Sequence, residues 1–319
     1  IVFTTKNLRP KYKLEAIRRD TILKTLIMEN HIRQIRFKGI KLSDLRTQND
    51  VSKNQPLKSL SYTIAASILR DFIMRFDGIP YSLHENNVKE LREALGDKIL
   101  VVAVDSTMIL AKEGSYRIAI APILSDVIGE HIEYLPLAFG NNEEDAFERL
   151  ANYIKKVVND ADHLIIIWNR THIKENLLKK INELIDIPHT IICQTKSHSL
   201  PRIGVNGGNP DFGTVVRLSK NTFLASLVLK PSEKYTVMPT LIRVYSDRYI
   251  PRIVKYIVHL STLSYDFAYQ PPSKAAILHI ADQKSKLINQ LIEYVGGFPS
   301  TEAVNLLSKL SSSDIMKKI

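Results

Sequence analysis

The fold is decided by residues 99–105, ILVVAVD, where an aliphatic run ends at Asp105. A short apolar run closed by a carboxylate is typical of a strand that is buried on both faces of a sheet. Two further strand-like runs follow at 116–124 and 131–139, with Gly129 between them. We therefore expect three consecutive strands at the start of a sheet, with Asp105 at the end of the first.

Beyond residue 140 the pattern alternates between helix and strand. The first of these helices has Asn141 or Asn142 as its N-cap and acidic residues in its first turn. Strands followed by alternating helices and strands predict an α/β layer fold with a mixed sheet, in the order of the RNase H-like fold. The predicted helices cover residues 142–161, 173–187, 250–263, 275–294 and 301–309, and the predicted strands cover 164–168, 190–194, 214–218 and 223–229, the last two as a hairpin.

The chain before residue 98 has a different character. It predicts a helix over 14–28, a short strand over 31–37 and a helix over 60–75, with residues 43–59 as a polar insertion or long loop. The change of pattern after Lys98 predicts two domains, one over 1–97 and one over 98–319.

Charge points to an anionic partner. Lys and Arg number 44 against 33 Asp and Glu, a formal net charge of +11. This excess favours nucleic acid ahead of a membrane surface, with a basic surface that binds nothing as the alternative. The single cysteine, Cys193, excludes an internal disulfide framework and a cysteine-based zinc site. With no visible signal peptide or membrane-spanning run, we expect a cytoplasmic protein.

Two acidic residues are candidates for metal chemistry. In an RNase H-like sheet, carboxylates at strand ends gather Mg²⁺ ions around a phosphodiester. Asp105 closes the first strand of the predicted sheet, and Asp282 lies on a predicted C-terminal helix. A turn-initiating Asp and a solvated helix face are the alternatives. The strand at 164–168 ends in residues 169–172, NRTH, which supply no carboxylate for a divalent ion.

Phosphate chemistry is predicted in the N-terminal region. Lys24, Gln34 and Arg75 lie on or beside three separate predicted elements. An amide and two cations that converge bind a terminal phosphate through charge-assisted hydrogen bonds. Solvated basic surface is the alternative for each of them.

Several segments together resemble the Argonaute superfamily. The segment around Gln34 and the run 75–81, RFDGIPY, resemble the MID domain of that family. The resemblance to the PIWI domain rests on residues 99–105, 164–171, 209–214, 223–239 and 278–282, in that order and spacing. It implies a Rossmann-like α/β MID domain followed by a PIWI domain with an RNase H-like fold.

The resemblance also implies roles for residues in the N-terminal region. The residues with which the family binds the 5′ phosphate of a guide strand correspond to Lys24, Gln34 and Arg75. The family's stacking Tyr falls on Asp20, so Tyr12 is expected to replace it. The family's C-terminal carboxylate helps to hold a metal at the guide phosphate, which makes Ile319 a candidate ligand for Mg²⁺.

For cutting of the target strand, the family uses four acidic positions. Asp105 and Asp282 match the first and last of them, whereas Thr171 stands in place of the second strand-end Asp. Glu143 or Glu144 lies where a glutamate finger belongs. The resemblance therefore implies a PIWI domain without an intact catalytic site and with no metal bound there.

The resemblance further implies a short prokaryotic Argonaute. Such a protein binds a guide, expected here to be RNA, and pairs it with complementary DNA. It works with an APAZ-type partner and an associated effector in defence against invading genetic elements. The alternatives are an active Mg²⁺- or Mn²⁺-dependent nuclease that uses Asp105, Asp282 and Glu144, and an α/β protein that binds a nucleotide or serves as a scaffold.

Overall fold

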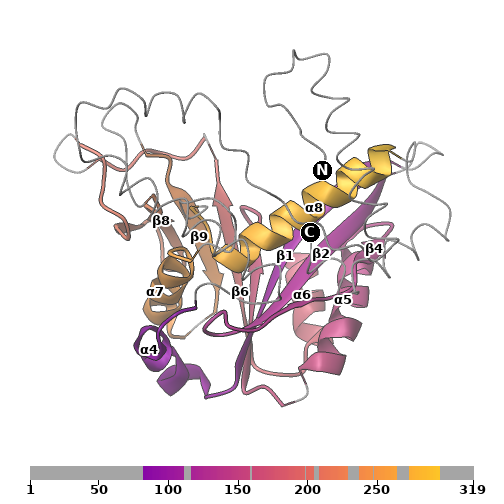
Figure 1. Cartoon of the computed structure of the whole chain (residues 1–319), viewed down its shortest axis with the longest axis horizontal. Coiled ribbons are helices and arrows are strands. Elements are labelled where there is room, and N and C mark those ends of the chain that lie inside the picture. The colour runs from indigo at the N-terminus through magenta and orange to yellow at the C-terminus, as the bar shows by residue number, and fades with distance from the viewer. Residues whose placement is uncertain are drawn as a thin grey trace, which may run out of the picture.

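The computed structural model describes residues 82–110, 116–158, 160–197, 199–204, 208–228, 237–246, 248–263 and 273–294. Their centre is a nine-stranded sheet in the order β3-β2-β1-β5-β6-β9-β8-β7, with β4 paired to β2 (Figure 1). The strands are β1 Ile99–Leu110, β2 Tyr116–Asp126, β3 Ile132–Tyr134, β4 Ala138–Gly140, β5 His163–Trp168, β6 His189–Lys196, β7 Val215–Arg217, β8 Thr222–Ala225 and β9 Thr240–Tyr245.

The sheet is mixed. β1, β5 and β6 run parallel to one another, and the remaining pairings in the sheet are antiparallel. The predicted hairpin is confirmed by the antiparallel pairing of β7 with β8. β9 was not assigned from the sequence, although it pairs with β6 on one side and β8 on the other.

The described helices are α4 Glu85–Leu95, α5 Glu143–Val157, α6 Glu175–Leu184, α7 Ile250–Leu260 and α8 Ala276–Tyr294. Asn142 caps α5 as expected, because its side-chain oxygen accepts a hydrogen bond of 2.9 Å from the backbone N–H of Asp145. The predicted helix over 301–309 lies outside the described residues.

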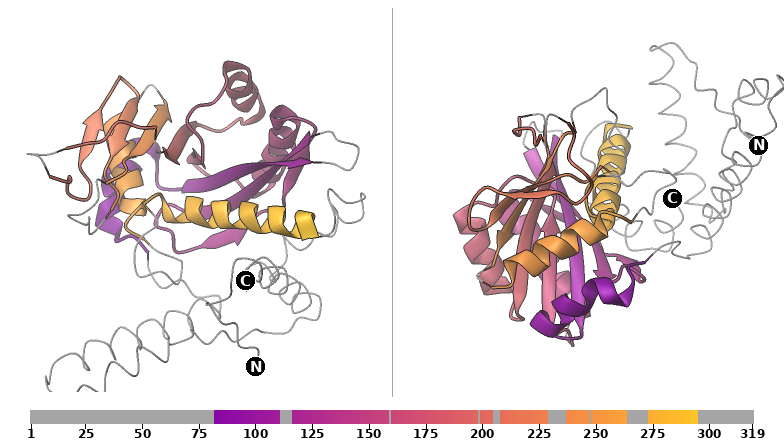
Figure 2. Two further views of the ribbon diagram at one scale, coloured as in Figure 1. Left: turned by 90° about the horizontal axis from the view of Figure 1, so that it is seen from above. Right: turned by 90° about the vertical axis from the view of Figure 1, so that its left-hand side faces the viewer.

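Helices cover both faces of the sheet, and each face has its own apolar core. Val102 and Val104 point into the core beneath α5 and α6, whereas Val101 and Ala103 point into the core beneath α4, α7 and α8. Figure 2 shows α8 lying along one face of β1 and β2, with α5 and α6 on the opposite face. The predicted α/β fold class is therefore confirmed.

The first strand is longer than predicted, and Asp105 lies inside it. β1 continues to Leu110 because β2 pairs with it along its whole length from Leu100, with Asp105 opposite Ala121. The polar residues that follow Asp105 look like the end of a strand. They are instead the part of β1 that extends beyond its pairing with β5, which ends at Val104.

The single strand predicted over 131–139 is also wrong. The structure has two short strands, β3 and β4, separated by residues 135–137. Pro136 lies in this interruption and has no N–H to donate to a neighbouring strand.

Helix α4 precedes the predicted domain boundary at residues 97 and 98. Its Val88 and Leu91 are nevertheless buried in the same apolar core as Ile253 of α7. The MID domain prediction otherwise concerns residues 1–81, which lie outside the described residues, so the boundary stays a prediction.

Two expectations drawn from composition concern membrane-spanning helices and the single cysteine. In the described part of the chain, no helix has the length and hydropathy needed to cross a membrane. Cys193 is buried on β6, and this burial raises the pKa of its thiol to about 12. The thiol therefore stays protonated and unreactive at neutral pH.

Candidate functional site

Three polar residues form a row across the centre of the sheet. Val104 of β1, Trp168 of β5 and Cys193 of β6 are register partners. The residues one position further along are Asp105, Asn169 and Gln194. Because side chains alternate between the faces of a sheet, these three point to the face that α8 covers, whereas Trp168 and Cys193 point into the core of α5 and α6.

Asp105 is buried and hydrogen-bonded within this row. Its Oδ1 accepts a hydrogen bond of 2.9 Å from the side-chain amide of Asn169, and Ser285 of α8 donates a second one. Burial raises the pKa of Asp105, and the nearby charge of Asp282 adds to this effect. The hydrogen bonds and the charge of Lys274 oppose it only in part.

Asp282 faces Asp105 from α8 and is held by two lysines. Its Oδ2 accepts hydrogen bonds of 2.8 Å from the ammonium groups of both Lys274 and Lys286. The Lys274 pair is largely buried, with 18% and 10% of the two side chains exposed, whereas Lys286 is 67% exposed. Burial opposes ionisation of Asp282, but the two lysines outweigh it and hold its pKa below the ordinary value.

A buried lysine fixes α8 over this region. The ammonium group of Lys284 donates hydrogen bonds of 2.8 Å to the carbonyl oxygen of Leu135 and 3.3 Å to that of Pro122. Pro122 lies opposite Val104, next to the Asp105 position of the β1–β2 ladder. Burial lowers the pKa of Lys284 to about 7. The helix that carries Asp282 and Ser285 is thus attached to the strand beside Asp105.

Cations gather at the end of β6, close to the start of α8. The pKa of Lys196 is lowered by burial and also by the positive charges of Lys274 and Arg202. Lys196 thus lies within electrostatic range of two other cations, and a local excess of positive charge favours a phosphate oxygen. No cluster of this kind was predicted from the sequence.

The structure therefore brings together two of the predicted catalytic positions, Asp105 and Asp282. Thr171 is not part of their site: it is exposed, and its hydroxyl lies 3.1 Å from Nδ1 of His172. The residue of the 169–172 segment that touches Asp105 is Asn169. Asn169 is thus the neighbour of Asp105 in this segment, and the role of Thr171 as the position of the missing carboxylate stays a prediction.

The two glutamate candidates lie at the start of α5. Glu143 is paired with Arg170, whose guanidinium lies 2.5 Å from its Oε1 and 4.9 Å above the ring of Trp168. Glu144 is exposed. Within the described residues neither glutamate contacts Asp105 or Asp282, and the role of a glutamate finger stays a prediction for both.

The predicted guide-phosphate residues lie outside the described residues. These are Tyr12, Lys24, Gln34, Arg75 and Ile319. Their grouping around a phosphate, and a Mg²⁺ ion at the Ile319 carboxylate, stay predictions.

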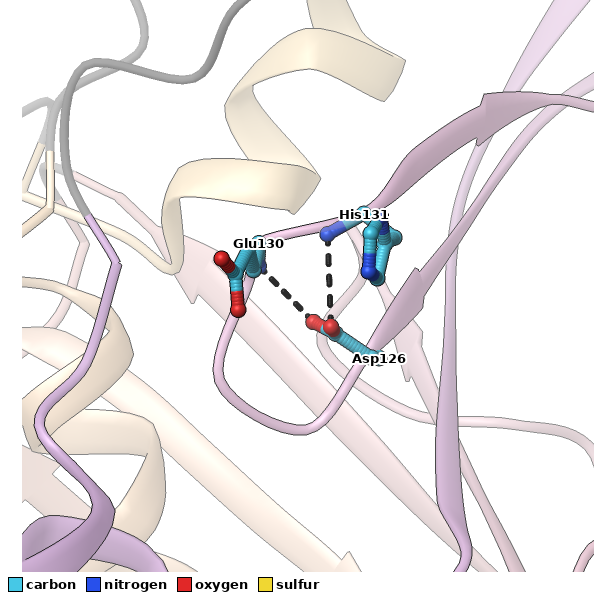
Figure 3. Close-up of side chains that lie close together, drawn as sticks. All are labelled: Asp126, Glu130 and His131. Carbon is cyan, nitrogen blue, oxygen red and sulfur yellow. Dashed lines mark hydrogen bonds between the residues drawn. The ribbon is translucent and has the colours of Figure 1, made fainter.

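One other cluster has the spacing of a metal site. Asp126, Glu130 and His131 lie in the turn from β2 to β3, and in the described part of the chain no other set of three or more His, Cys, Asp or Glu residues has ligand atoms so close together (Figure 3). The carboxylate of Asp126 accepts backbone hydrogen bonds of 2.8 Å from Glu130 and 3.3 Å from His131. These bonds shape the turn, which Gly129 completes at a φ of +77°. The cluster is explained by the turn.

Several residues of the site were missed by sequence reasoning. Asn169 and Gln194 each carry a recognisable signal, since both follow a buried apolar run on the same face as Asp105. Ser285 and Lys286 lie three and four residues after Asp282, which places all three on one side of a helix. Lys274 carries no such signal, because only the fold brings it to Asp282.

Comparisons with known proteins bear on the fold of the chain. A scan against protein-family models gives no match, and neither does a search of curated proteins. Among solved structures, Aquifex aeolicus Argonaute matches with a TM-score of 0.60 and 16% identity, over 90% of this chain and 42% of that protein. Clostridium butyricum Argonaute, bound to a guide DNA and a 19-mer target DNA, matches with a TM-score of 0.59 and 18% identity, over 84% of this chain and 35% of that protein.

A third match is the C-terminal lobe of a budding yeast Argonaute, with a TM-score of 0.53 and 14% identity. It covers 75% of this chain and 57% of that lobe. The chain thus spans about a third to just over half of the proteins that it matches. Both prokaryotic and eukaryotic Argonaute structures thus match most of this chain. The chain therefore has the fold of the Argonaute superfamily.

Proposed function

We propose that this chain binds a guide strand by its 5′ phosphate, pairs the guide with complementary nucleic acid and does not cut the target. The observation that carries the proposal is the row Asp105, Asn169 and Gln194, which has one carboxylate and two amides in the Argonaute fold. Neutral amides lack the negative charge that holds divalent ions beside a phosphodiester. The row thus supports binding without cleavage.

Binding to nucleic acid is supported by charge as well as by the fold. The chain has a formal net charge of +11, and Lys196, Arg202 and Lys274 gather beside the polar row. Contacts of this kind are made with phosphates and carry no sequence information, so base pairing of the guide selects the target. Solved relatives contain guide DNA with target DNA in one case and guide RNA in another. We propose an RNA guide and a DNA target for this chain.

The wider role follows from the family resemblance. The chain signals target capture to an APAZ-type partner with an associated effector, in prokaryotic defence against invading genetic elements. Its guide site consists of Lys24, Gln34 and Arg75 with Tyr12, and of the Ile319 carboxylate with a Mg²⁺ ion. The protein acts in the cytoplasm.

The test begins with nucleic acid that copurifies with the full chain. Short 5′-phosphorylated strands are expected in the wild type and are expected to be reduced at least about tenfold in Lys24→Ala/Gln34→Ala, because two charge-assisted contacts are lost. Lys179→Ala is the matched control, since Lys179 is an exposed lysine on α6. Equal guide content in all three proteins contradicts the guide site.

A cleavage assay tests the second half of the proposal. The guide-loaded chain is incubated with a complementary target and Mg²⁺ or Mn²⁺, and no cut is expected. Cutting that disappears in Asp105→Ala would establish the active nuclease instead. Absence of any bound oligonucleotide would favour the nucleotide-binding or scaffold alternative.

A further inference from the structure

The metal pair that the fold family implies does not fit the residues at this site. Asp105 is the only carboxylate of the row, and its Oδ1 already accepts a hydrogen bond from Asn169. Asp282 already accepts hydrogen bonds from two ammonium groups. A divalent ion would have to displace these cations and would then find amides where hard oxygen anions are needed.

The ion pair of Lys274 with Asp282 has no obvious value for stability. Both side chains are mostly buried, and the cost of desolvating two charges is comparable to their attraction. An exposed pair such as Lys179 and Glu175 avoids this cost. The burial of a positive charge beside two acids therefore calls for a role other than packing.

The position of Lys274 is fixed by Gln194 of the row. The side-chain oxygen of Gln194 accepts a hydrogen bond of 3.0 Å from the backbone N–H of Ala275, the next residue after Lys274. The other end of the same amide, Nε2, is buried and has no acceptor among the described residues. Two donor groups thus lie near the start of α8. One is this amide, and the other is the Lys274 ammonium, whose hydrogen-bond acceptor among the described residues is Asp282.

We infer that the Lys274 ammonium takes the place of a divalent metal at this site and contacts a backbone phosphate of the guide–target duplex. This inference rests on the proposed function, because it assumes that nucleic acid lies over α8 and the end of β6. An ammonium group has three N–H donors, and Asp282 orients it by accepting one of them. The remaining donors neutralise a phosphate oxygen without a metal, assisted by the nearby charges of Lys196 and Arg202.

Target affinity as a function of salt tests the contact. The full chain is loaded with a 5′-phosphorylated guide, and the Kd for a complementary oligonucleotide is measured at several KCl concentrations, in EDTA and in Mg²⁺ at matched ionic strength. Because EDTA also removes the Mg²⁺ ion proposed at the guide phosphate, the ratio of the Kd in EDTA to the Kd in Mg²⁺ is expected to be the same in the wild type and in Asp105→Asn. Lys274→Met is expected to weaken target binding about fivefold and to reduce the slope of log Kd against log salt by about 0.9, the value for one phosphate contact.

Controls separate this contact from general charge and from misfolding. Lys179→Met removes an equal charge on the other side of the sheet, on α6, and is expected to leave the slope unchanged. Lys274→Arg keeps the charge and is expected to keep the wild-type slope. If Lys274→Met does not fold, Lys274→Gln replaces it, because a glutamine amide still donates to Asp282. An unchanged Kd and slope in the neutral variant would overturn the inference and leave Lys274 as a structural ion pair.

A second measurement tests the absence of the metal. Mn²⁺ is titrated into the chain without nucleic acid and followed by electron paramagnetic resonance, for the wild type and for Asp105→Asn. Equal Mn²⁺ binding in the two proteins is expected, since Asp105 takes no metal. Binding that is lost in Asp105→Asn overturns the inference. Failure of the wild type to bind any guide would instead refute the proposed function, and the Mn²⁺ result would still stand by itself.

Discussion

The two faces of the central sheet bury different chemistry. The face under α5 and α6 is an apolar core in which the rings of Phe147 and Trp168 stack with their centroids 5.6 Å apart. The opposite face also has an apolar core, under α4 and α7, but it buries more polar groups, among them Asp105, Asp282, Gln194 and Lys284 in the part that α8 covers. Burying polar and charged groups is costly, so their concentration under one helix indicates function there, whereas the apolar face indicates only stability.

The largest expected effect comes from breaking the apolar face. Phe147→Ala removes a fully buried ring from α5 and leaves a cavity beside Trp168. We expect the free energy of unfolding to fall by about 3–5 kcal/mol, as measured by urea denaturation. Nucleic-acid affinity per folded molecule should be unchanged. A loss of less than about 1 kcal/mol would mean that this face repacks easily.

Acid should destabilise the protein through a buried polar pair at the start of β5 and β6. His163 is buried, and its Nε2 lies 3.0 Å from Oγ1 of Thr190. Burial and the neighbouring His189 lower the pKa of His163 to about 4. In the unfolded chain the imidazole of His163 takes up a proton near pH 6.5, whereas in the folded protein it stays neutral down to about pH 4. The free energy of unfolding therefore falls by roughly 3 kcal/mol as the pH drops from above 6.5 to 4.

Unfolding free energies at pH 7 and pH 4.5 check this expectation. His163→Gln should remove much of the difference between the two pH values, whereas His131→Gln, at an exposed position, should not. The same pH dependence in His163→Gln and the wild type would assign acid sensitivity to other groups.

A smaller effect is expected from uncoupling the buried ion pair. Asp282→Asn removes the negative charge that compensates the Lys274 ammonium, and we expect a loss of about 2 kcal/mol in the free energy of unfolding. Glu175→Gln removes the acid of an exposed pair with Lys179 and should cost less than about 0.5 kcal/mol. Chemical denaturation of both variants measures the contrast. Equal losses would show that burial adds nothing to the Lys274 pair.

The smallest effect is expected at Thr171. Thr171→Asp adds a carboxylate at an exposed position without contact to Asp105, so stability should change by less than about 0.5 kcal/mol and no cleavage should appear. Asn169→Asp replaces the donor to Asp105 by a like charge and should cost about 1–2 kcal/mol. Thermal melting and a Mn²⁺ cleavage assay compare the two. Cleavage gained by Thr171→Asp would restore Thr171 as the missing catalytic position.

The sequence predicted the fold better than the site. Apolar runs of strand length identified β1, β5 and β6, because parallel strands covered on both faces must be apolar throughout. The end of β1 was missed since pairing with β2, a tertiary property, keeps the polar residues after Asp105 in the strand. β9 follows a stretch without a clear period and is defined by its neighbours β6 and β8.

The site shows the same division. Asp105 was identified by its place at the end of an apolar run and Asp282 through the family resemblance, and the structure brings the two together. Thr171 was preferred to Asn169 as the position of the missing carboxylate. A sequence does not show which of the residues after a strand still points towards Asp105. The contact of Lys274 with Asp282 could not be predicted, because the two residues are eight positions apart and only the bend before α8 brings them together.

The attachment of Lys284 has a consequence for how the chain folds. Its hydrogen bond to Pro122 joins residues 162 positions apart, and its bond to Leu135 spans 149. Contacts of such high order form late, because a long loop must close before they stabilise anything. During synthesis, β1 and β2 therefore emerge from the ribosome well before α8 exists to cover them. Their apolar face stays exposed until residues 276–294 have been translated, and exposed apolar surface of this kind favours aggregation.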